Sequence, residues 1–316
     1  MRRRYRGSVR RLFYAQTFPN KPLSIIVPVP PGSSTDLVAR ILAERLPARL
    51  GQPVVVENRS GASGFLGAGF VAKAPADGHT LALVPSTLFI AAHLLPKGAG
   101  GGLDVIRDFT PIVRTATSPL LILANPQLGV KTPQQIVAYL KKNPGQGYGT
   151  SGNGSPMHIA GELFTKSAGV ELTHVPYRGV MPAVNDTVSG QIKIVFSALG
   201  GIGQFISAGK LVPIAIIERQ RSELLPGVPT LSESGIAGVE VSVFFPLLAP
   251  AGTPNDVIQR LNQEANAILR SPEVRDRLRT AGVQVQGGTA EEAARLIRDD
   301  FARYGRIIQE FSIKAD

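Results

Sequence analysis

The sequence of 316 residues contains no cysteine, which excludes disulfides, thiol catalysis and cysteine metal sites. Its four histidines share no close metal-ligand spacing, so the sequence does not predict a zinc site. No uninterrupted apolar run approaches the roughly 20 residues that a membrane-spanning helix needs. There is no Walker A motif, and the lone Gly152-x-Gly154 is too weak to indicate a dinucleotide site. We therefore expect neither a metal nor a cofactor.

Positive charge is concentrated at the N-terminus. The formal net charge is +11, but residues 1–16 carry six arginines and no acid. The remaining chain has no long basic run, which argues against nucleic-acid binding and leaves a mild positive field that attracts small anions. Residues 1–17 begin like a signal peptide but lack its apolar middle. We interpret them as an incomplete leader or, equally, as a disordered basic tail.

Apolar runs and helical patterns alternate along the first part of the chain. With 43% hydrophobic residues, the chain is long enough for two domains with separate cores. Apolar, β-branched runs predict strands at 23–29, 54–57 and 81–84, and helical periodicity predicts helices at 35–50 and near 68–73. This order is typical of an α/β fold with a mostly parallel sheet.

A second alternating set follows, and the chain then ends in helical segments. Strands are expected at 120–124, 147–150, 173–175, 192–196, 211–217 and 239–248, and helices at 132–142, 156–167, 181–189, 202–208, 254–269, 272–281 and 290–311. The C-terminal helices come without strands, whereas the first set lacks covering helices. We therefore expect a discontinuous first domain, residues 22–123 with 246–316, and an inserted domain, 124–245. The segment 239–248 and the region around Ala124 would be the hinge pair.

The loop Pro30–Asp36 joins the C-terminal end of an expected strand to a helix start, which is where ligands bind in open α/β sheets. Free N–H groups at a helix start favour an anion. Gly32 would let a ligand approach the backbone, and the hydroxyls that follow could donate to it. The alternative is a simple turn in which Ser34 or Thr35 serves only as the N-cap. The candidate ligand-binding residues here are Pro31, Gly32, Ser33, Ser34, Thr35 and Asp36.

A second loop repeats this chemistry. Ser155 followed by Pro156 is a strong helix-start signal, and His158 falls in the first helical turn. The alternative for His158 is a buried hydrogen-bonding role. With one such loop in each expected domain, the pair predicts a clamshell that closes around a carboxylate. The candidates in this loop are Ser151, Asn153, Gly154, Ser155 and His158.

Weaker candidates also follow expected strands. Ser86 and Thr87 could line the cleft, although simple turn chemistry explains them equally well. Tyr177 and Ser197 stand at two further strand ends, and Arg178 could pair with a carboxylate or remain solvated.

Nine motifs together resemble the substrate-binding proteins of tripartite tricarboxylate transporters, the Bug/TctC family. The resemblance runs from about Phe18 to the C-terminus. The motifs are FPNKPLSIIVPVPPGSSTD, LGQPVVVENRSGASG, DGHT, RDFTP, SGNGSPMHIAGELF, THVPYRG, GKLVPIAI, LPGVPTLSESG and LLAPAGTP.

The resemblance implies a periplasmic binding protein type II fold, with two α/β domains joined by a two-strand hinge. It implies a monomeric, non-enzymatic periplasmic receptor that binds a small carboxylate in the interdomain cleft and delivers it to the membrane subunits of a transporter. Family members hold the ligand largely through two loops, which correspond to Pro30–Asp36 and Ser151–His158.

Two departures from the family pattern bear on the ligand. Ser33-Ser34 replaces a Gly-Gly pair, and Lys193 and Ser197 stand where acids are often found. Because a cationic amine would lack an acidic partner at Ser197, we expect a plain mono- or dicarboxylate rather than an amino acid.

Three other functions remain open from the sequence. The first is a sensor that reports its ligand to a membrane partner. The second is an anion-processing hydrolase with Ser151 or Ser155 as nucleophile and His158 as base, although no nearby acid would orient the base. The third is a transcription-factor effector domain, but no helix-turn-helix segment precedes residue 20.

Overall fold

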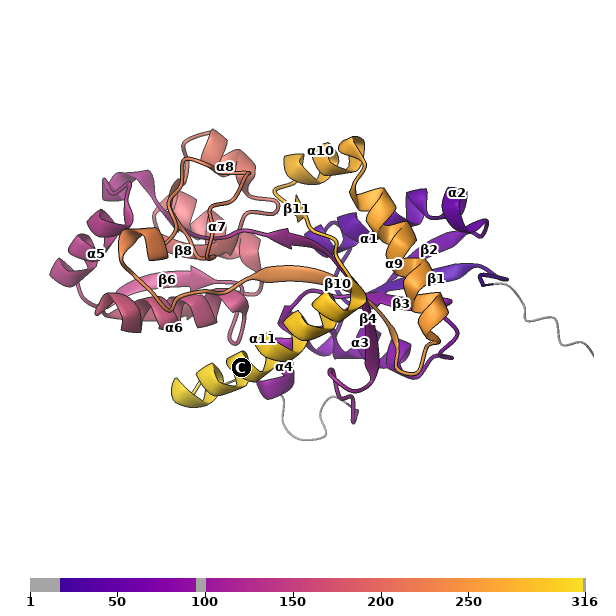
Figure 1. Ribbon diagram of the computed structural model, residues 1–316. Helices are drawn as coiled ribbons and strands as arrows, with labels where there is room; N and C mark the ends of the chain where they lie inside the picture. Colours follow the sequence, from indigo (N-terminus) through magenta and orange to yellow (C-terminus); the bar gives the residue numbers. More distant parts are fainter. Residues whose placement is uncertain (1–17, 95–100, 315–316) are drawn as a thin grey trace, which may run out of the picture.

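The computed structural model describes residues 18–94 and 101–314 and shows a mixed α/β chain. Two β-sheets lie side by side, each with helices against it (Figure 1). The expected leader, residues 1–17, lies outside the described residues. Among the residues that are described, no helix is both long and apolar enough to cross a lipid bilayer.

The first sheet has the strand order β11-β4-β10-β3-β1-β2. Its strands are β1 Leu23–Val27, β2 Val54–Asn58, β3 Thr80–Leu83, β4 Phe109–Ser118, β10 Val243–Pro250 and β11 Gln284–Val285. β1 runs parallel to β2 and β3, whereas β10 is antiparallel to β3 and β4. β1 is almost entirely buried, as expected of a parallel strand covered on both faces.

The second sheet has the order β7-β6-β8-β5-β9. Its strands are β5 Leu120–Ala124, β6 Gln146–Thr150, β7 Leu172–Pro176, β8 Ile194–Ala198 and β9 Val212–Ile216. β6 is parallel to β7 and β8, and β5 is antiparallel to β8 and β9. The carboxyl ends of β6, β7 and β8 therefore point the same way.

Helices cover both sheets. They are α1 Ser34–Arg45, α2 Pro47–Leu50, α3 Phe65–Ala72, α4 Thr87–Leu94, α5 Pro133–Lys142, α6 Pro156–Ala168, α7 Val180–Ser189, α8 Gly203–Ser207, α9 Asn255–Leu269, α10 Pro272–Thr280 and α11 Ala290–Glu310. The single helix expected over 35–50 is two helices, because Pro47 starts a new turn at the end of α1. The α9 and α11 helices contact β4, and α11 also contacts α4.

The chain crosses between the sheets twice. It leaves the first sheet at the end of β4 and enters the second at β5, with only Pro119 between them. It returns between β9 and β10. The expected boundary at 123/124 would place β5 with the first sheet, but β5 pairs with β8 and β9. The first crossing is therefore at Pro119 and not around Ala124.

Three elements were missed by the sequence patterns. The strand β4 contains Thr115, Thr117 and Ser118, which break its apolar run, yet all three are buried. Thr115 donates to the backbone oxygen of Phe245 in β10, so pairing satisfies a polar group that the sequence alone would leave unpaired. The apolar helix α4 and the two-residue strand β11 gave no periodic signal.

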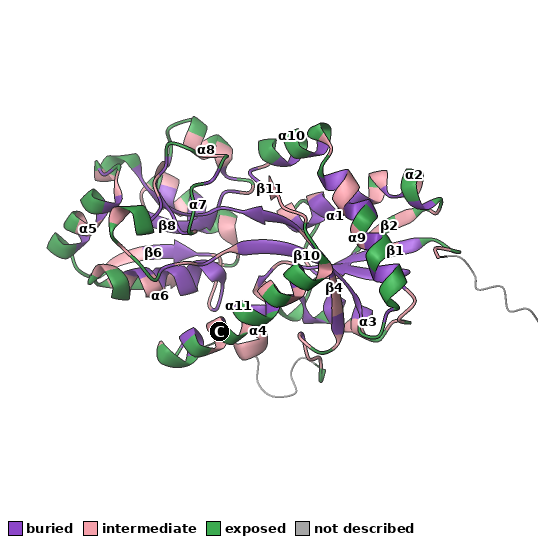
Figure 2. Cartoon of the chain, in the orientation of Figure 1, coloured by how far each residue is buried: buried purple, intermediate pink, exposed green. Residues whose placement is uncertain are grey.

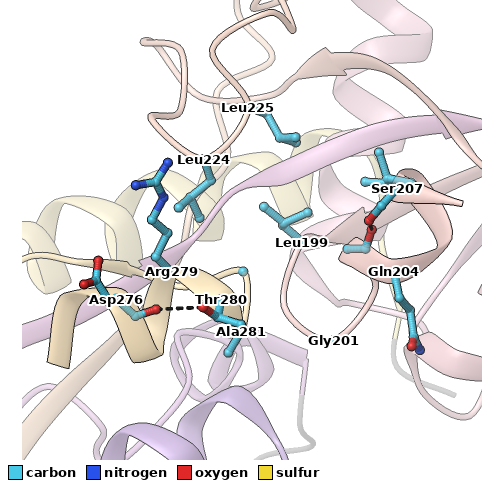
Figure 3. A pocket seen from close by; sticks show the side chains of 13 residues that line it. Leu199, Gly201, Gln204, Ser207, Leu224, Leu225, Asp276, Arg279, Thr280 and Ala281 are labelled. Carbon is cyan, nitrogen blue, oxygen red and sulfur yellow. Dashed lines mark hydrogen bonds between the residues drawn. The ribbon is translucent and has the colours of Figure 1, made fainter. Parts of the chain in front are cut away.

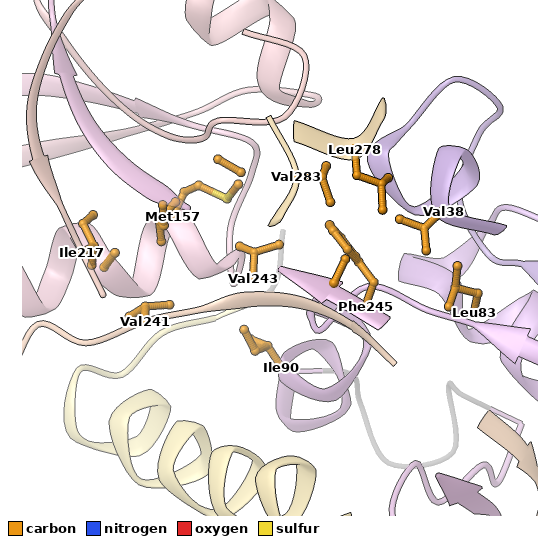
Figure 4. Close-up of a cluster of buried hydrophobic side chains, with 14 of the residues drawn as sticks. Val38, Leu83, Ile90, Met157, Ile217, Val241, Val243, Phe245, Leu278 and Val283 are labelled. Atoms are coloured by element: carbon orange, nitrogen blue, oxygen red, sulfur yellow. The ribbon is translucent and has the colours of Figure 1, made fainter. Parts of the chain in front are cut away.

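Burial follows the sheets and continues through the second crossing. The strands of both sheets are mostly buried, and exposure concentrates on the outer faces of the helices (Figure 2). Where the chain returns from the second sheet to β10, Val241 and Val243 belong to the same hydrophobic cluster as Met157 of α6 and Ile90 of α4 (Figure 4). This hydrophobic cluster contains residues from both sheets. The two halves therefore share apolar contacts at the hinge.

Candidate functional site

The loop before α1 is closed by two hydrogen bonds that link its ends. Ser33 is the N-cap, and its Oγ accepts from the amide of Asp36 at 3.2 Å. The carboxylate of Asp36 accepts in return from the amide of Gly32 at 2.9 Å. Gly32 has a φ of +83°, a conformation that favours glycine. The N-cap is thus Ser33, and not Ser34 or Thr35.

Asp36 holds this loop in place. The residue is 2% exposed, and its oxygens also accept from Arg40 Nε at 2.8 Å and from Asn58 Nδ2 at 2.9 Å. Burial acts to raise the pKa of the Asp36 carboxyl, but hydrogen bonds from Arg40, Gly32 and Asn58 hold it below its ordinary value. Its carboxylate is therefore ionised and engaged within the protein, which makes Asp36 a positioning group.

The loop before α6 repeats this arrangement. Ser155 is the N-cap and Pro156 the first helical residue, as the sequence predicts. The Oγ of Ser155 accepts from the amide of His158 at 3.2 Å, and Nδ1 of His158 accepts from the amide of Gly154 at 3.1 Å. Gly154 has a φ of +66°. Both loops therefore have the pattern Gly-Ser-x-x-acceptor, in which the side chain of the third helical residue accepts a hydrogen bond from the glycine amide.

A buried network fixes His158. Its ring stacks on His174 with centroids 3.7 Å apart, and its Nε2 lies 3.6 Å from Oε1 of Glu162. The same carboxylate oxygen accepts from the hydroxyl of Tyr148 at 2.7 Å. The hydrogen bond with His158 is the main cause that lowers the pKa of Glu162, against burial, which raises it. Because Nδ1 accepts from Gly154, the ring proton lies on Nε2, which faces Glu162.

This network does not form a nucleophile–base pair. Ser155 Oγ caps the helix, and Ser151 Oγ donates to Sδ of Met157 at 3.4 Å. The two ring nitrogens of His158 face Gly154 and Glu162. A serine hydrolase needs the base to accept the proton of the serine hydroxyl, and these contacts occupy the groups that would do so.

The first-turn amides at each helix start need an acceptor from outside the helix. The amides of the first helical turn have no acceptor within the helix, and the N-cap serine accepts only the third of them. In the first loop, the amides of residues 34 and 35 have no acceptor in the helix or at the N-cap side chain. In the second loop this holds for the amide of residue 157, because Pro156 has no N–H. These amides are suited to an anion.

The Ser86 hydroxyl holds the start of β10. It is 1% exposed, and its Oγ accepts from the amide of Phe244 at 3.3 Å. Thr87 is half-buried and begins α4. Asn153 is half-buried beside Gly154. The Ser86 side chain is thus engaged with the returning strand.

Tyr177 and Ser197 have partners of their own. The hydroxyl of Tyr177 donates to Asp186 at 2.8 Å, and burial together with this carboxylate raises the pKa of Tyr177 to about 12. Ser197 is 0% exposed, and its Oγ donates to the backbone oxygen of Ala198. Arg178 is exposed. In this conformation, a ligand in solvent cannot reach Ser197.

A third glycine segment joins the site and was missed by the sequence patterns. The amide of Gly200, just after β8, donates to Oγ of Ser118 at 3.0 Å, across the first crossing. A Cβ on Gly200 would lie 2.3 Å from Oγ of Ser34. The sequence did contain a signal for this segment, the pair Gly200-Gly201 shortly after an expected strand. That strand is parallel to β6, so its carboxyl end lies at the same edge of the sheet as the loop that begins at Ser151.

The second loop also touches the opposite half of the molecule. A Cβ on Gly154 would lie 1.8 Å from Cδ1 of Leu94 in α4. The halves thus approach each other at Gly154 and at Gly200. A cavity of about 870 Å³ lies between α8 and α10, and its lining includes Leu199 and Gly201, on either side of Gly200, as well as Gln204 and Arg279 (Figure 3). None of the candidate residues from either loop lines it.

Comparison with known proteins identifies the family. The model of the tripartite tricarboxylate transporter family receptor, TctC, matches residues 38–313. The chain belongs to this family. It is 34% identical over 303 residues to protein BugT of Bordetella pertussis, covering 95% of this chain and 92% of BugT.

Two solved structures are similar throughout. An R. palustris protein solved with adipate is 32% identical, with a TM-score of 0.83 and coverage of 95% of this chain and 100% of that one. MatC from Rhodopseudomonas palustris, solved with malate, is 30% identical, with a TM-score of 0.77 and coverage of 92% and 100%. The fold is therefore the two-domain, type II periplasmic binding protein fold, as expected. Members of this family are solute receptors and not enzymes.

Proposed function

We propose that this chain is a periplasmic receptor that binds a small carboxylate between its two domains and delivers it to the membrane subunits of a tripartite tricarboxylate transporter. The observation that carries the proposal is the pair of Gly-Ser-x-x-acceptor loops at the starts of α1 and α6. The ligands of the two R. palustris structures, adipate and malate, are both dicarboxylates and support the same chemistry.

We assign the two domains by sheet. Residues 22–118 and 243–314 form one, and residues 120–241 form the other. The loop before α1 then belongs to the first domain and the loop before α6 to the second. A ligand that contacts both loops favours the closed form, because a ligand shifts an equilibrium only by its differential affinity for the two states.

Binding rests on backbone amides in this proposal. A helix terminus contributes about 0.3–2 kcal/mol to holding an anion, and each charge-assisted hydrogen bond contributes roughly 1.5–3 kcal/mol. Together, two such loops give about 8 kcal/mol, which corresponds to micromolar affinity without an arginine or lysine clamp. Ser34 and Thr35 supply amides in this scheme, Ser33 and Ser155 act as caps, and Asp36 and His158 position the glycine before each cap.

The test is isothermal titration calorimetry with adipate, malate and succinate, and with the matched diamides as uncharged controls. We expect saturable binding of at least one diacid with a stoichiometry of one and no binding of its diamide. Equal binding of acid and diamide would show that the sites do not select an anion. Native mass spectrometry of the freshly purified protein would identify an acid that co-purifies with it.

A further inference from the structure

One buried serine joins the two sheets beside the first crossing. Ser118 is the last residue of β4 and is 1% exposed. Its Oγ accepts from the amide of Gly200, in the turn after β8, at 3.0 Å. The same hydroxyl donates to the backbone oxygen of Gly282, between α10 and β11, at 3.2 Å. A single side chain therefore connects three segments that are far apart in the sequence.

The two bonds of Ser118 differ in the parts of the molecule that they join. Ser118 pairs with Val243 of β10, and Gly282 directly precedes the segment of β11, so both residues belong to the first sheet. Gly200 follows β8 of the second sheet. A rotation of one sheet against the other therefore acts on the bond from Gly200 and leaves the bond to Gly282 in place.

Close packing surrounds this contact. A Cβ on Gly282 would lie 2.8 Å from the backbone oxygen of Leu199, so the turn before β11 packs directly on the residue that precedes Gly200. Gly200 also meets the loop before α1, because a Cβ there would lie 2.3 Å from Oγ of Ser34. Gly200 thus contacts both Ser118 and the helix start whose amides we assign to the ligand.

We propose that Ser118 is a positioning residue for ligand capture, whose hydroxyl holds Gly200 and the second domain against the loop before α1. This rests on the proposed function, because Gly200 meets Ser34 where we place the ligand. The hydroxyl suits the role since its proton is used by Gly282, which leaves a lone pair of the oxygen for the amide of Gly200. The bond favours the arrangement that binds ligand, and apparent affinity rises with the fraction of protein in that arrangement.

The domain arrangement can be measured without any ligand. Because the sequence has no cysteine, Lys73→Cys at the end of α3 and Lys141→Cys in α5 place one spin label in each domain. Both lysines are exposed. We expect double electron–electron resonance to show one narrow distance distribution in this background and a broader or displaced one when Ser118→Ala is added. An unchanged distribution in Ser118→Ala overturns the proposal.

Thr115→Val is the matched control. Thr115 is also a buried residue of β4 whose hydroxyl donates to a backbone oxygen, but its partner Phe245 lies in β10 of the same sheet. Both variants lose one buried hydroxyl from the same strand, and both should unfold at a lower urea concentration. Only Ser118→Ala should change the distances between the labels. A change of equal size in Thr115→Val would indicate a general loss of packing and overturn the proposal.

Ligand binding gives a second measurement. For a diacid that binds the wild type, Ser118→Ala should weaken affinity by about two- to tenfold, mainly through faster dissociation, and Thr115→Val should change it by less than about twofold. Wild-type affinity in Ser118→Ala would overturn the positioning role. If no diacid binds the wild type, the proposed function fails, and the distances between the labels still decide whether Ser118 holds the domains.

Hydrogen exchange in the wild type decides the case if Ser118→Ala does not fold. After correction for intrinsic rates, the amide of Gly200 should exchange at least about tenfold more slowly than the amide of the exposed Gly201. A saturating diacid should slow the exchange of Gly200 further. Equal exchange of the two amides, measured by NMR, would mean that the bond to Ser118 does not hold in solution and would overturn the proposal.

Discussion

The backbone amide of Gly154 donates to Nδ1 of His158 at 3.1 Å, four residues along the chain. The bond ties the left-handed glycine to the first turn of α6, and the stacked ring of His174 holds His158 in turn. His158 therefore shapes the loop from within the protein, which is the second of the two roles that the sequence left open for it.

Removal of either positioning side chain should weaken ligand binding although neither needs to touch the ligand. We expect His158→Ala and Asp36→Ala to lose affinity for the diacid by about tenfold or more, with a loss of stability on the order of 1–2 kcal/mol from the lost bonds. Asp36→Asn keeps an oxygen that can accept from Gly32 and should retain more affinity than Asp36→Ala. Calorimetry and urea denaturation measure both quantities, and equal affinities for Asn and Ala at this position would contradict the positioning role.

Gly32 offers a test of backbone conformation alone. Nothing lies within 4 Å of a Cβ built on it, so a substitution acts only through its φ of +83°. Gly32→Val should weaken binding by about five- to thirtyfold because a β-branched residue is unfavourable there by about 1–2 kcal/mol, whereas Gly32→Asn should retain most of the affinity because asparagine tolerates this region. Both variants should fold, as judged by circular dichroism. Unchanged affinity in Gly32→Val would show that this loop conformation is not needed.

Gly200→Ala should oppose the approach of the two domains. Its backbone conformation suits any residue, but the new Cβ would lie 2.3 Å from Oγ of Ser34. We expect weaker diacid binding, and partial recovery in Gly200→Ala with Ser34→Ala, because the second change removes the clashing oxygen. A double-mutant cycle by calorimetry measures this coupling. Additive losses would mean that the two residues do not meet in the bound state.

Ligand selectivity should favour a plain diacid over an amino acid. The carboxylate of Asp36 is already engaged by Gly32, Arg40 and Asn58, and Ser197 is buried and carries no charge, so the ammonium group of an amino acid would lack an acidic partner. We expect succinate to bind at least about tenfold more tightly than aspartate, the difference that about 1.4 kcal/mol produces. Competition calorimetry with the two ligands measures the ratio, and tighter binding of aspartate would contradict this view.

Glu218 should make stability depend on pH. Its pKa is raised from an ordinary value of 4.5 to about 7 by burial, so the folded state favours the protonated form. The stabilisation that Glu218 contributes is therefore fully present below about pH 4.5 and is lost as the pH rises through about 7. The free energy of unfolding should fall by roughly 3 kcal/mol in total over this range. Urea denaturation between about pH 5 and about pH 8 should show a steeper loss in the wild type than in Glu218→Gln. Parallel pH profiles would mean that Glu218 is not desolvated in the folded protein.

The sequence by itself determined the local elements and the chemistry of the loops. The apolar run that becomes β1 and the Ser155-Pro156 helix start depend on neighbouring residues only, so their patterns were enough to predict them. The resemblance in the quoted motifs predicted the family and, with it, the fold. Composition and spacing also predicted that each expected domain supplies one helix start suited to an anion.

Only the tertiary structure decided which groups meet. The strand β4 is held by pairing with β10, whose residues lie more than a hundred positions away, and the buried hydroxyl of Thr115 finds its partner through that pairing. The first crossing falls at Pro119 because β5 pairs with β8 and β9. The contact between Gly200 and Ser34 and the two bonds of Ser118 likewise join segments far apart in the chain. Such contacts carry no local periodicity, so no pattern in neighbouring residues could have predicted them.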